Sequence, residues 1–110
     1  MIDMERIDEL AELELEDANK IHRRYFASDH ECYSVIKEEL EEAEEEMARL
    51  KHSLDALWLM VKMDSDLEDM LIDMKRISYF VIAEAIQVYA MCEKGLRTNA
   101  LKEGGYEQHG

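Results

Sequence analysis

The sequence contains no proline and only four glycines, three of which fall in the last seven residues. Nothing before Gly95 therefore supplies the usual turn residues of a β-sheet or a loop-rich fold. No signal peptide and no apolar run long enough to cross a bilayer is recognisable, which argues against a membrane partner and favours a cytoplasmic location. We predict an all-α protein with a single domain over residues 1–101 and a polar, disordered tail over residues 102–110.

Basic residues are also scarce, because 13 lysines and arginines stand against 27 acids, which gives a net charge of -14 with histidine neutral. Such a charge would repel a phosphate backbone, so we expect no direct nucleic-acid binding, whereas a cation is a suitable partner. Cys32 and Cys92 are the only cysteines. In a hairpin they would lie about five residues, or roughly 7 Å, apart along the axis, so we expect free thiols in a reducing compartment.

Three helices are expected, over residues 2–24, 31–63 and 66–99. The first carries only a partial apolar stripe. Ser28 or Asp29 is placed to cap the start of the second helix. A turn at Asp64-Ser65 would separate the second helix from the third, although the linking segment has no glycine.

Apolar residues follow one another in steps of three and four along both long helices, which is typical of a packed heptad seam. On the second helix these are Tyr33, Ile36, Leu40, Ala43, Met47, Leu50, Leu54, Leu57 and Val61. On the third, where a serine and a cysteine stand among them, they are Leu67, Leu71, Met74, Ser78, Val81, Ala85, Val88 and Cys92. The pattern predicts a long antiparallel helical hairpin, accompanied by the shorter N-terminal helix.

Further apolar residues lie off these seams, and one short helix is not enough to cover them. They are Trp58, Leu59, Ile72, Phe80, Ile82, Ile86 and Met91. Some of them could pack against the N-terminal helix, but we favour homo-oligomerisation as the way in which this apolar surface is covered. We therefore expect a dimer or tetramer that completes a helical bundle.

Two pairs of oxygen-bearing side chains are spaced to project from one side of their helices, namely Glu39 with Glu42 and Glu84 with Gln87. In a hairpin that turns at Asp64-Ser65, positions whose numbers sum to about 129 lie side by side. Glu42 would then face Gln87, and Glu84 would face Glu45. Several oxygen ligands would converge there, as a hard divalent cation such as Mg²⁺ requires.

Glu84 stands in an apolar stripe between Phe80 and Met91, and burial of a lone carboxylate is costly. The carboxylate therefore needs a cation, a hydrogen-bond network or a proton. Arg49 or Lys94 could supply the positive charge instead of a metal. From the residues alone, a metal site and a structural polar network both stay open.

Residues 35–42 contain an EExxE pattern, and residues 84–91 look like a matching second motif. Together they resemble the MazG-like all-α nucleoside triphosphate pyrophosphohydrolases. The second motif of that family is normally ExxD, and here Gln87 stands at the Asp position. The form ExxQ is similar to that of phage-encoded relatives, which implies a phage or prophage origin. The resemblance covers about residues 30–97.

The resemblance implies a hydrolase that splits a nucleoside triphosphate into a nucleoside monophosphate and pyrophosphate. It assigns Glu39, Glu42 and Glu84 as ligands of Mg²⁺, or of Mn²⁺. Gln87 would be a neutral ligand or a residue that contacts the ligands without binding the ion. The base and sugar of the nucleotide are not specified.

The same resemblance leaves the general base open between Glu38 and Glu46. Lys94 and Arg49 are the candidates for phosphate contacts, because each lies on the stripe of a proposed ligand pair. The alternative is a catalytically inactive helical oligomerisation or adaptor module that retains the fold, in which Glu84 is paired with one of these two cations.

Overall fold

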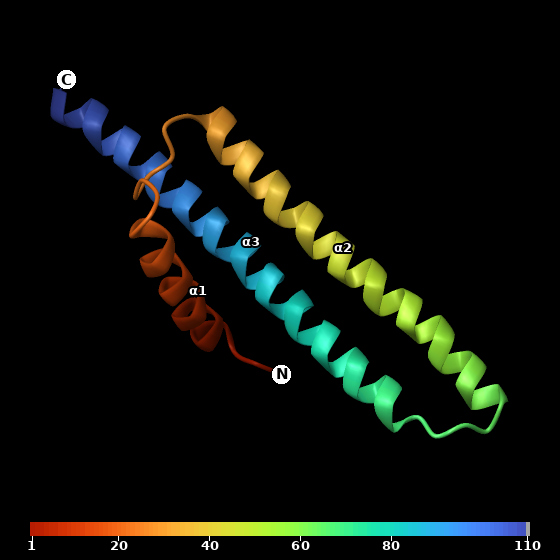
Figure 1. Cartoon of the computed structure of the whole chain (residues 1–110). Coiled ribbons are helices and arrows are strands. Elements are labelled where there is room, and N and C mark those ends of the chain that lie inside the picture. Colours follow the sequence, from red (N-terminus) through yellow and green to blue (C-terminus); the bar gives the residue numbers. More distant parts are fainter. Residues whose placement is uncertain (110) are drawn as a thin grey trace. The chain divides into compact units, whose positions relative to one another are not determined.

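The computed structural model describes the backbone of residues 1–109 and the side chains of residues 1–103. It contains three helices, α1 (Met4–Asn19), α2 (Asp29–Lys62) and α3 (Glu68–His109) (Figure 1). The described backbone holds no strand, so the all-α prediction is confirmed for that part of the chain. No helix in it carries an apolar stretch that could span a membrane.

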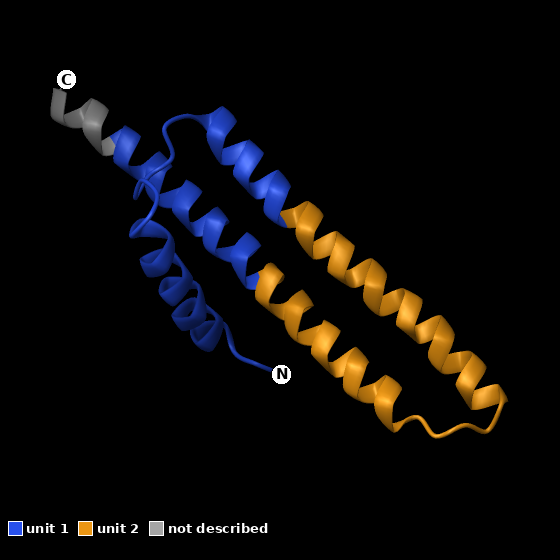
Figure 2. Ribbon diagram, in the orientation of Figure 1, with its two compact units in different colours: residues 1–39, 86–110 blue, residues 40–85 orange. Residues whose placement is uncertain are grey.

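The chain forms two compact units whose boundaries fall inside α2 and α3 (Figure 2). Residues 1–39 and 86–110 make up one, here called the three-segment unit, and residues 40–85 make up the hairpin unit. Because the units share two helices, the single domain expected over residues 1–101 stays a prediction. So does the disordered tail, since most of its side chains lie outside the described residues.

The three-segment unit holds most of the buried apolar side chains. Its core consists of Ala11, Leu15, Phe26, Ala90 and Met91, with Cys32, Val35 and Ile36 packed against it. Helix α1 contributes to this core through residues four apart, which lie on one face of a helix. The short α1 is thus held by apolar contacts from a small patch of its surface.

Helix α1 ends at Asn19, five residues before the end that the sequence pattern predicted. The chain leaves the helix so that the Phe26 ring can enter the core, where it is 5% exposed. The Phe26 amide donates a hydrogen bond to Thr98 Oγ1 at 3.0 Å, which replaces the helical partner that this N–H gives up. The prediction of a helix to residue 24 was wrong because local periodicity carries no information on this tertiary contact.

Polar contacts and one glycine also fix the three-segment unit. Arg97 Nη2 lies 2.6 Å from a carboxylate oxygen of Glu12, and this hydrogen bond lowers the pKa of Glu12. Both side chains are about half exposed, so the ion pair adds little stability. A Cβ atom at Gly95 would lie 3.0 Å from Cys32 Sγ, so glycine at this position allows α3 to approach the start of α2 closely.

Two hydrogen bonds from backbone amides to side chains cap the start of α2. The Ser28 hydroxyl accepts a hydrogen bond from the Glu31 amide at 3.1 Å, as expected for an N-cap residue. The Glu31 carboxylate accepts from the Ala27 amide at 3.1 Å. This reciprocal arrangement is close to a capping box. Of the two predicted caps, the structure uses Ser28.

In the hairpin unit, α2 ends in a Schellman motif without glycine. The Ser65 amide donates to the Met60 carbonyl at 3.0 Å, and the Asp64 amide donates to the Val61 carbonyl at 3.1 Å. Asp64 has a φ of 54°, in the left-handed region. The predicted turn at Asp64-Ser65 is therefore confirmed, and the Asp66 carboxylate caps α3 by accepting from the Glu68 amide at 3.1 Å.

We expect Asp64→Gly to raise the free energy of unfolding by about 0.5–1 kcal/mol, because glycine adopts the left-handed conformation without the strain of a Cβ atom. Asp64→Val should lower it by about 1–2 kcal/mol, since a β-branched residue fits this conformation poorly. Urea denaturation of both variants and the parent provides the measurement. Equal stability of the glycine and valine variants would mean that the turn at position 64 has another backbone conformation.

The hairpin unit has little core of its own. Within residues 40–85, all of which the structure describes, Ile77 is the one buried residue, with 7% of its surface exposed. The heptad seam predicted on α2 divides into two rows with different exposure. Ala43, Leu50 and Leu57 are half-buried, whereas Leu40, Met47, Leu54 and Val61 are 46–55% exposed. Part of the predicted seam is therefore exposed in this chain.

Candidate functional site

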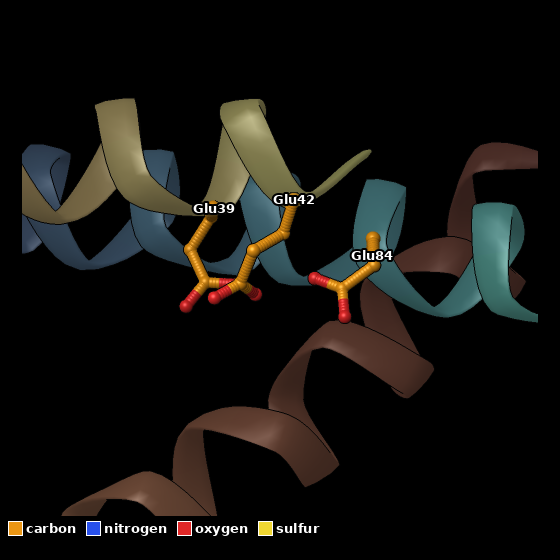
Figure 3. Close-up of side chains that lie close together, drawn as sticks. All are labelled: Glu39, Glu42 and Glu84. Atoms are coloured by element: carbon orange, nitrogen blue, oxygen red, sulfur yellow. The ribbon is translucent and has the colours of Figure 1, made fainter. Parts of the chain in front are cut away.

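Three glutamates from α2 and α3 gather at one place. Glu42 and Glu84 belong to the hairpin unit, and Glu39 lies one helical turn before Glu42 on α2. One carboxylate oxygen from each residue lies within 4.8 Å of the other two (Figure 3). The i,i+3 spacing places Glu39 and Glu42 on the same side of α2, which is why their carboxylates can point to one spot. The sequence-based expectation that these three residues converge is met by their placement.

Burial distinguishes this group from the solvated acids of α2. Glu39 and Glu84 are part-buried, and Oε2 of Glu84 is shielded from solvent. Three carboxylates in such a space repel one another unless positive charge or protons offset them. Their oxygens are of the type that Mg²⁺ and Mn²⁺ prefer, and their spacing suits ligands of one ion. The residues present therefore fit a hard divalent cation.

The Gln87 side chain has a polar contact with α1. Its Nε2 atom donates a hydrogen bond of 2.5 Å to a carboxylate oxygen of Glu14 on α1. Glu84, in turn, lies close to Glu39 and Glu42. The Gln87 side chain therefore contacts α1, and the sequence pattern did not predict this contact.

The two candidates for a general base lie in different surroundings. Both carboxylate oxygens of Glu46 accept hydrogen bonds from Arg49 Nη1, at 3.0 and 3.2 Å. Arg49 therefore forms an ion pair on its own helix, and it lines a groove in the hairpin unit together with His52 and Arg76. Glu38 instead lines a larger cleft, together with Glu39.

This cleft belongs to the three-segment unit and has a volume of about 1010 Å³. That size is at the upper end of the range for small-molecule sites. Its acidic lining residues are Glu14, Asp17, Glu31, Glu38 and Glu39, and its basic lining residues are His22, Arg23 and Lys94. Because acids predominate, a polyphosphate would enter the cleft only together with cations.

Lys94 is the most deeply buried cation on the cleft wall, with 6% of its surface exposed. Its ammonium lies over the Phe26 ring, 4.7 Å from the ring centroid, which is a cation–π contact. Lys94 therefore places a positive charge on the cleft wall, beside an aromatic ring.

Sequence reasoning missed Glu14 and Arg23 as lining residues of the cleft. Glu14 lies beside Leu15 and one turn after Ala11, both of which are buried, and this position on the apolar stripe of α1 marks it as facing the core. Arg23 lies in the irregular segment after α1, where periodicity gives no orientation. Its place could be known only from the fold.

Cys32 and Cys92 are both free thiols, as predicted. Burial raises the pKa of the Cys32 thiol, with smaller contributions from the neighbouring Cys92 and Asp29. A raised pKa leaves less thiolate, so Cys32 is a poor nucleophile. The arrangement does not favour thiol chemistry.

The structure thus offers a carboxylate cluster for a hard cation and, in the three-segment unit, a cleft with a buried lysine. Comparison with protein-family models, with curated proteins and with solved structures yields no match for this chain.

Proposed function

We propose that the chain is a Mg²⁺-dependent nucleoside triphosphate pyrophosphohydrolase that acts as a homo-oligomer in the cytoplasm. The observation that carries the proposal is the convergence of Glu39, Glu42 and Glu84, with oxygens within 4.8 Å of one another. The resemblance to the MazG-like enzymes in residues 35–42 and 84–91 supports the same chemistry. Mn²⁺ is expected to replace Mg²⁺.

In this proposal the three glutamates hold the cation. A bound Mg²⁺ would neutralise phosphate charge and favour ionisation of a water molecule. Glu38 is the better candidate for the general base, because both oxygens of Glu46 already accept hydrogen bonds from Arg49. Within its cleft, Lys94 would donate to a phosphate oxygen, and Arg23 would add a second positive charge.

Gln87 has a supporting role here and is not a ligand. It holds the Glu14 carboxylate at the wall of the cleft through a short hydrogen bond. Arg49 is likewise removed from the phosphate contacts, because it is paired with Glu46. The proposed site therefore differs from the one that the resemblance alone implied at these two positions.

The first test is thermal unfolding of the full chain in EDTA and in millimolar Mg²⁺ or Mn²⁺, followed by a pyrophosphate-release assay with a panel of nucleoside triphosphates. We expect the metal to raise the midpoint by several degrees, since a ligand that binds the native state alone stabilises it. Glu39→Gln/Glu84→Gln should lose both the rise and the activity. Glu44→Gln/Glu45→Gln removes the same charge from exposed positions of α2 and should keep both.

An equal rise in both double variants would show non-specific binding of metal to an acidic protein and would contradict the proposal. An alternative function, a catalytically inactive oligomerisation or adaptor module, predicts no metal-dependent rise. If Glu84 belongs to a buried ion pair in such a module, Glu39→Gln/Glu84→Gln should also lose about 3 kcal/mol of stability in EDTA.

A further inference from the structure

We infer that the exposed row of α2 in the hairpin unit is a self-association surface, on which a second copy of the chain packs its own α2 in antiparallel orientation. The row consists of Leu40, Met47, Leu54 and Val61, and is called the outer row below. The pairing rests on the homo-oligomer part of the proposed function and specifies its interface, whereas the metal-dependent rise in the unfolding midpoint tests the carboxylate cluster separately.

The exposed area of the chain is large enough to include an interface. A folded monomer of this mass, 12.9 kDa, exposes roughly 6300 Å². This chain exposes 8701 Å². The excess of roughly 2400 Å² is well above the ~800 Å² that each partner contributes to an interface of standard size. Exposed area is thus sufficient for a stable dimer.

Within the exposed area, the outer row has the geometry of an interface. Its four members are spaced by seven residues, and their exposed fractions are 47%, 46%, 55% and 46%. A repeat of seven residues forms a nearly straight stripe on a helix and is the pattern of a coiled-coil seam. Trp58, which follows Leu54 by one turn, is 59% exposed and extends the stripe. Large apolar side chains in such a stripe mark an interaction surface.

The spacing is self-complementary in one orientation. When two copies of α2 run antiparallel about a two-fold axis between Met47 and Leu54, Met47 of each copy faces Leu54 of the other. Leu40 then faces Val61 in the same way. A two-fold axis requires each surface to match itself, and the outer row meets this condition. The occupant that fits is therefore a second copy of this chain.

Charge selects the antiparallel orientation over the parallel one. Residues 38–46 contain seven acids in nine positions. A parallel pair would place the two acidic runs side by side, and like charges at such distances repel. In the antiparallel register each run lies beside residues 55–63 of the other copy, which contain one acid, Asp55, and one base, Lys62. Repulsion between the runs is then avoided.

The mass of the full chain in solution tests the surface. We expect sedimentation equilibrium to give twice the chain mass of 12.9 kDa, and Met47→Lys/Leu54→Lys to weaken association at least 100-fold. Leu59→Lys is the matched control, because Leu59 is 55% exposed on the opposite side of α2 and should leave the mass unchanged. A single-chain mass for the parent, or equal loss of association in the control, would overturn the inference.

Crosslinking tests the orientation without a destabilising charge. In a background with Cys32→Ser and Cys92→Ser, one chain carries Met47→Cys and another carries Leu54→Cys. In the antiparallel register two copies of position 47 lie seven residues, or about 10 Å, apart along the axis, too far for a disulfide. Oxidation should therefore link the two chains in their mixture and leave each chain unlinked by itself. Efficient linking of the Met47→Cys chain to itself would indicate a parallel pair and overturn the proposal.

Discussion

Replacement of Phe26 by alanine is expected to lower the free energy of unfolding by about 3–5 kcal/mol, measured by urea denaturation. The ring is 5% exposed and belongs to the core of the three-segment unit with Leu15 and Met91. It also supports the Lys94 ammonium at 4.7 Å from its centroid. A domain of this size has a total stability of about 5–15 kcal/mol, so the loss would leave a large unfolded fraction.

Tyr33→Ala is the matched control for this prediction. Tyr33 lies on α2 in the same unit but is 69% exposed, so the stability of this variant should stay within about 0.5 kcal/mol of the parent. Phe26→Leu keeps an apolar side chain in the core and should lose less than Phe26→Ala. A loss below about 1 kcal/mol for Phe26→Ala would show that the ring is not in the core.

Phe26 also shows what the sequence could not predict. It lies in an irregular segment between two helices, where no apolar period assigns a direction to its side chain. Its burial depends on Ala90 and Met91, more than sixty residues away in the chain. The helices themselves could be predicted, because the absence of proline and the scarcity of glycine leave little else for the apolar spacing to form.

The heptad seam of α2 shows a second feature that the sequence could not predict. A row of apolar residues shows that a helix face avoids water, but it does not show whether the cover belongs to the same chain or to another. Leu50 and Leu57 are half-buried, whereas Leu40 and Met47 are exposed, although all four belong to one regular pattern. The division follows from the direction in which α3 approaches α2, which is a property of the fold.

The candidate site was predictable where it depends on helical spacing and unpredictable where it depends on register. Glu39 and Glu42 share a side of α2 because they are three residues apart, and Glu84 was expected near them from the antiparallel order. Counting about the turn did not predict the contact of Gln87 with α1, since it concerns only the pairing of α2 with α3. The contact of Gln87 with Glu14 arises from the packing of α1. The sequence pattern did not predict where along α3 this helix would pack.

Replacement of Gln87 by aspartate would restore the ExxD form of the motif, yet we expect it to destabilise the protein by roughly 3 kcal/mol in EDTA. The Gln87 amide donates to the Glu14 carboxylate at 2.5 Å, and both groups line one cleft. Aspartate removes this donor and places a second negative charge in the same part-buried space. A lost hydrogen bond to a charged group costs about 1.5–3 kcal/mol, and charge repulsion adds to it.

Gln87→Asn separates the two contributions, because asparagine has the size of aspartate without its charge. It should lose only the hydrogen bond, and Gln87→Asp should be less stable still. Adding Glu14→Gln to Gln87→Asp removes one of the two charges and should recover part of the loss, which tests the contact directly. Millimolar Mg²⁺ should stabilise Gln87→Asp more than the parent, since two facing carboxylates attract a divalent cation. Equal stability of Gln87→Asp and Gln87→Asn in EDTA would instead mean that the Glu14 carboxylate does not lie opposite position 87, and Glu14 would then lose its place in the proposed site.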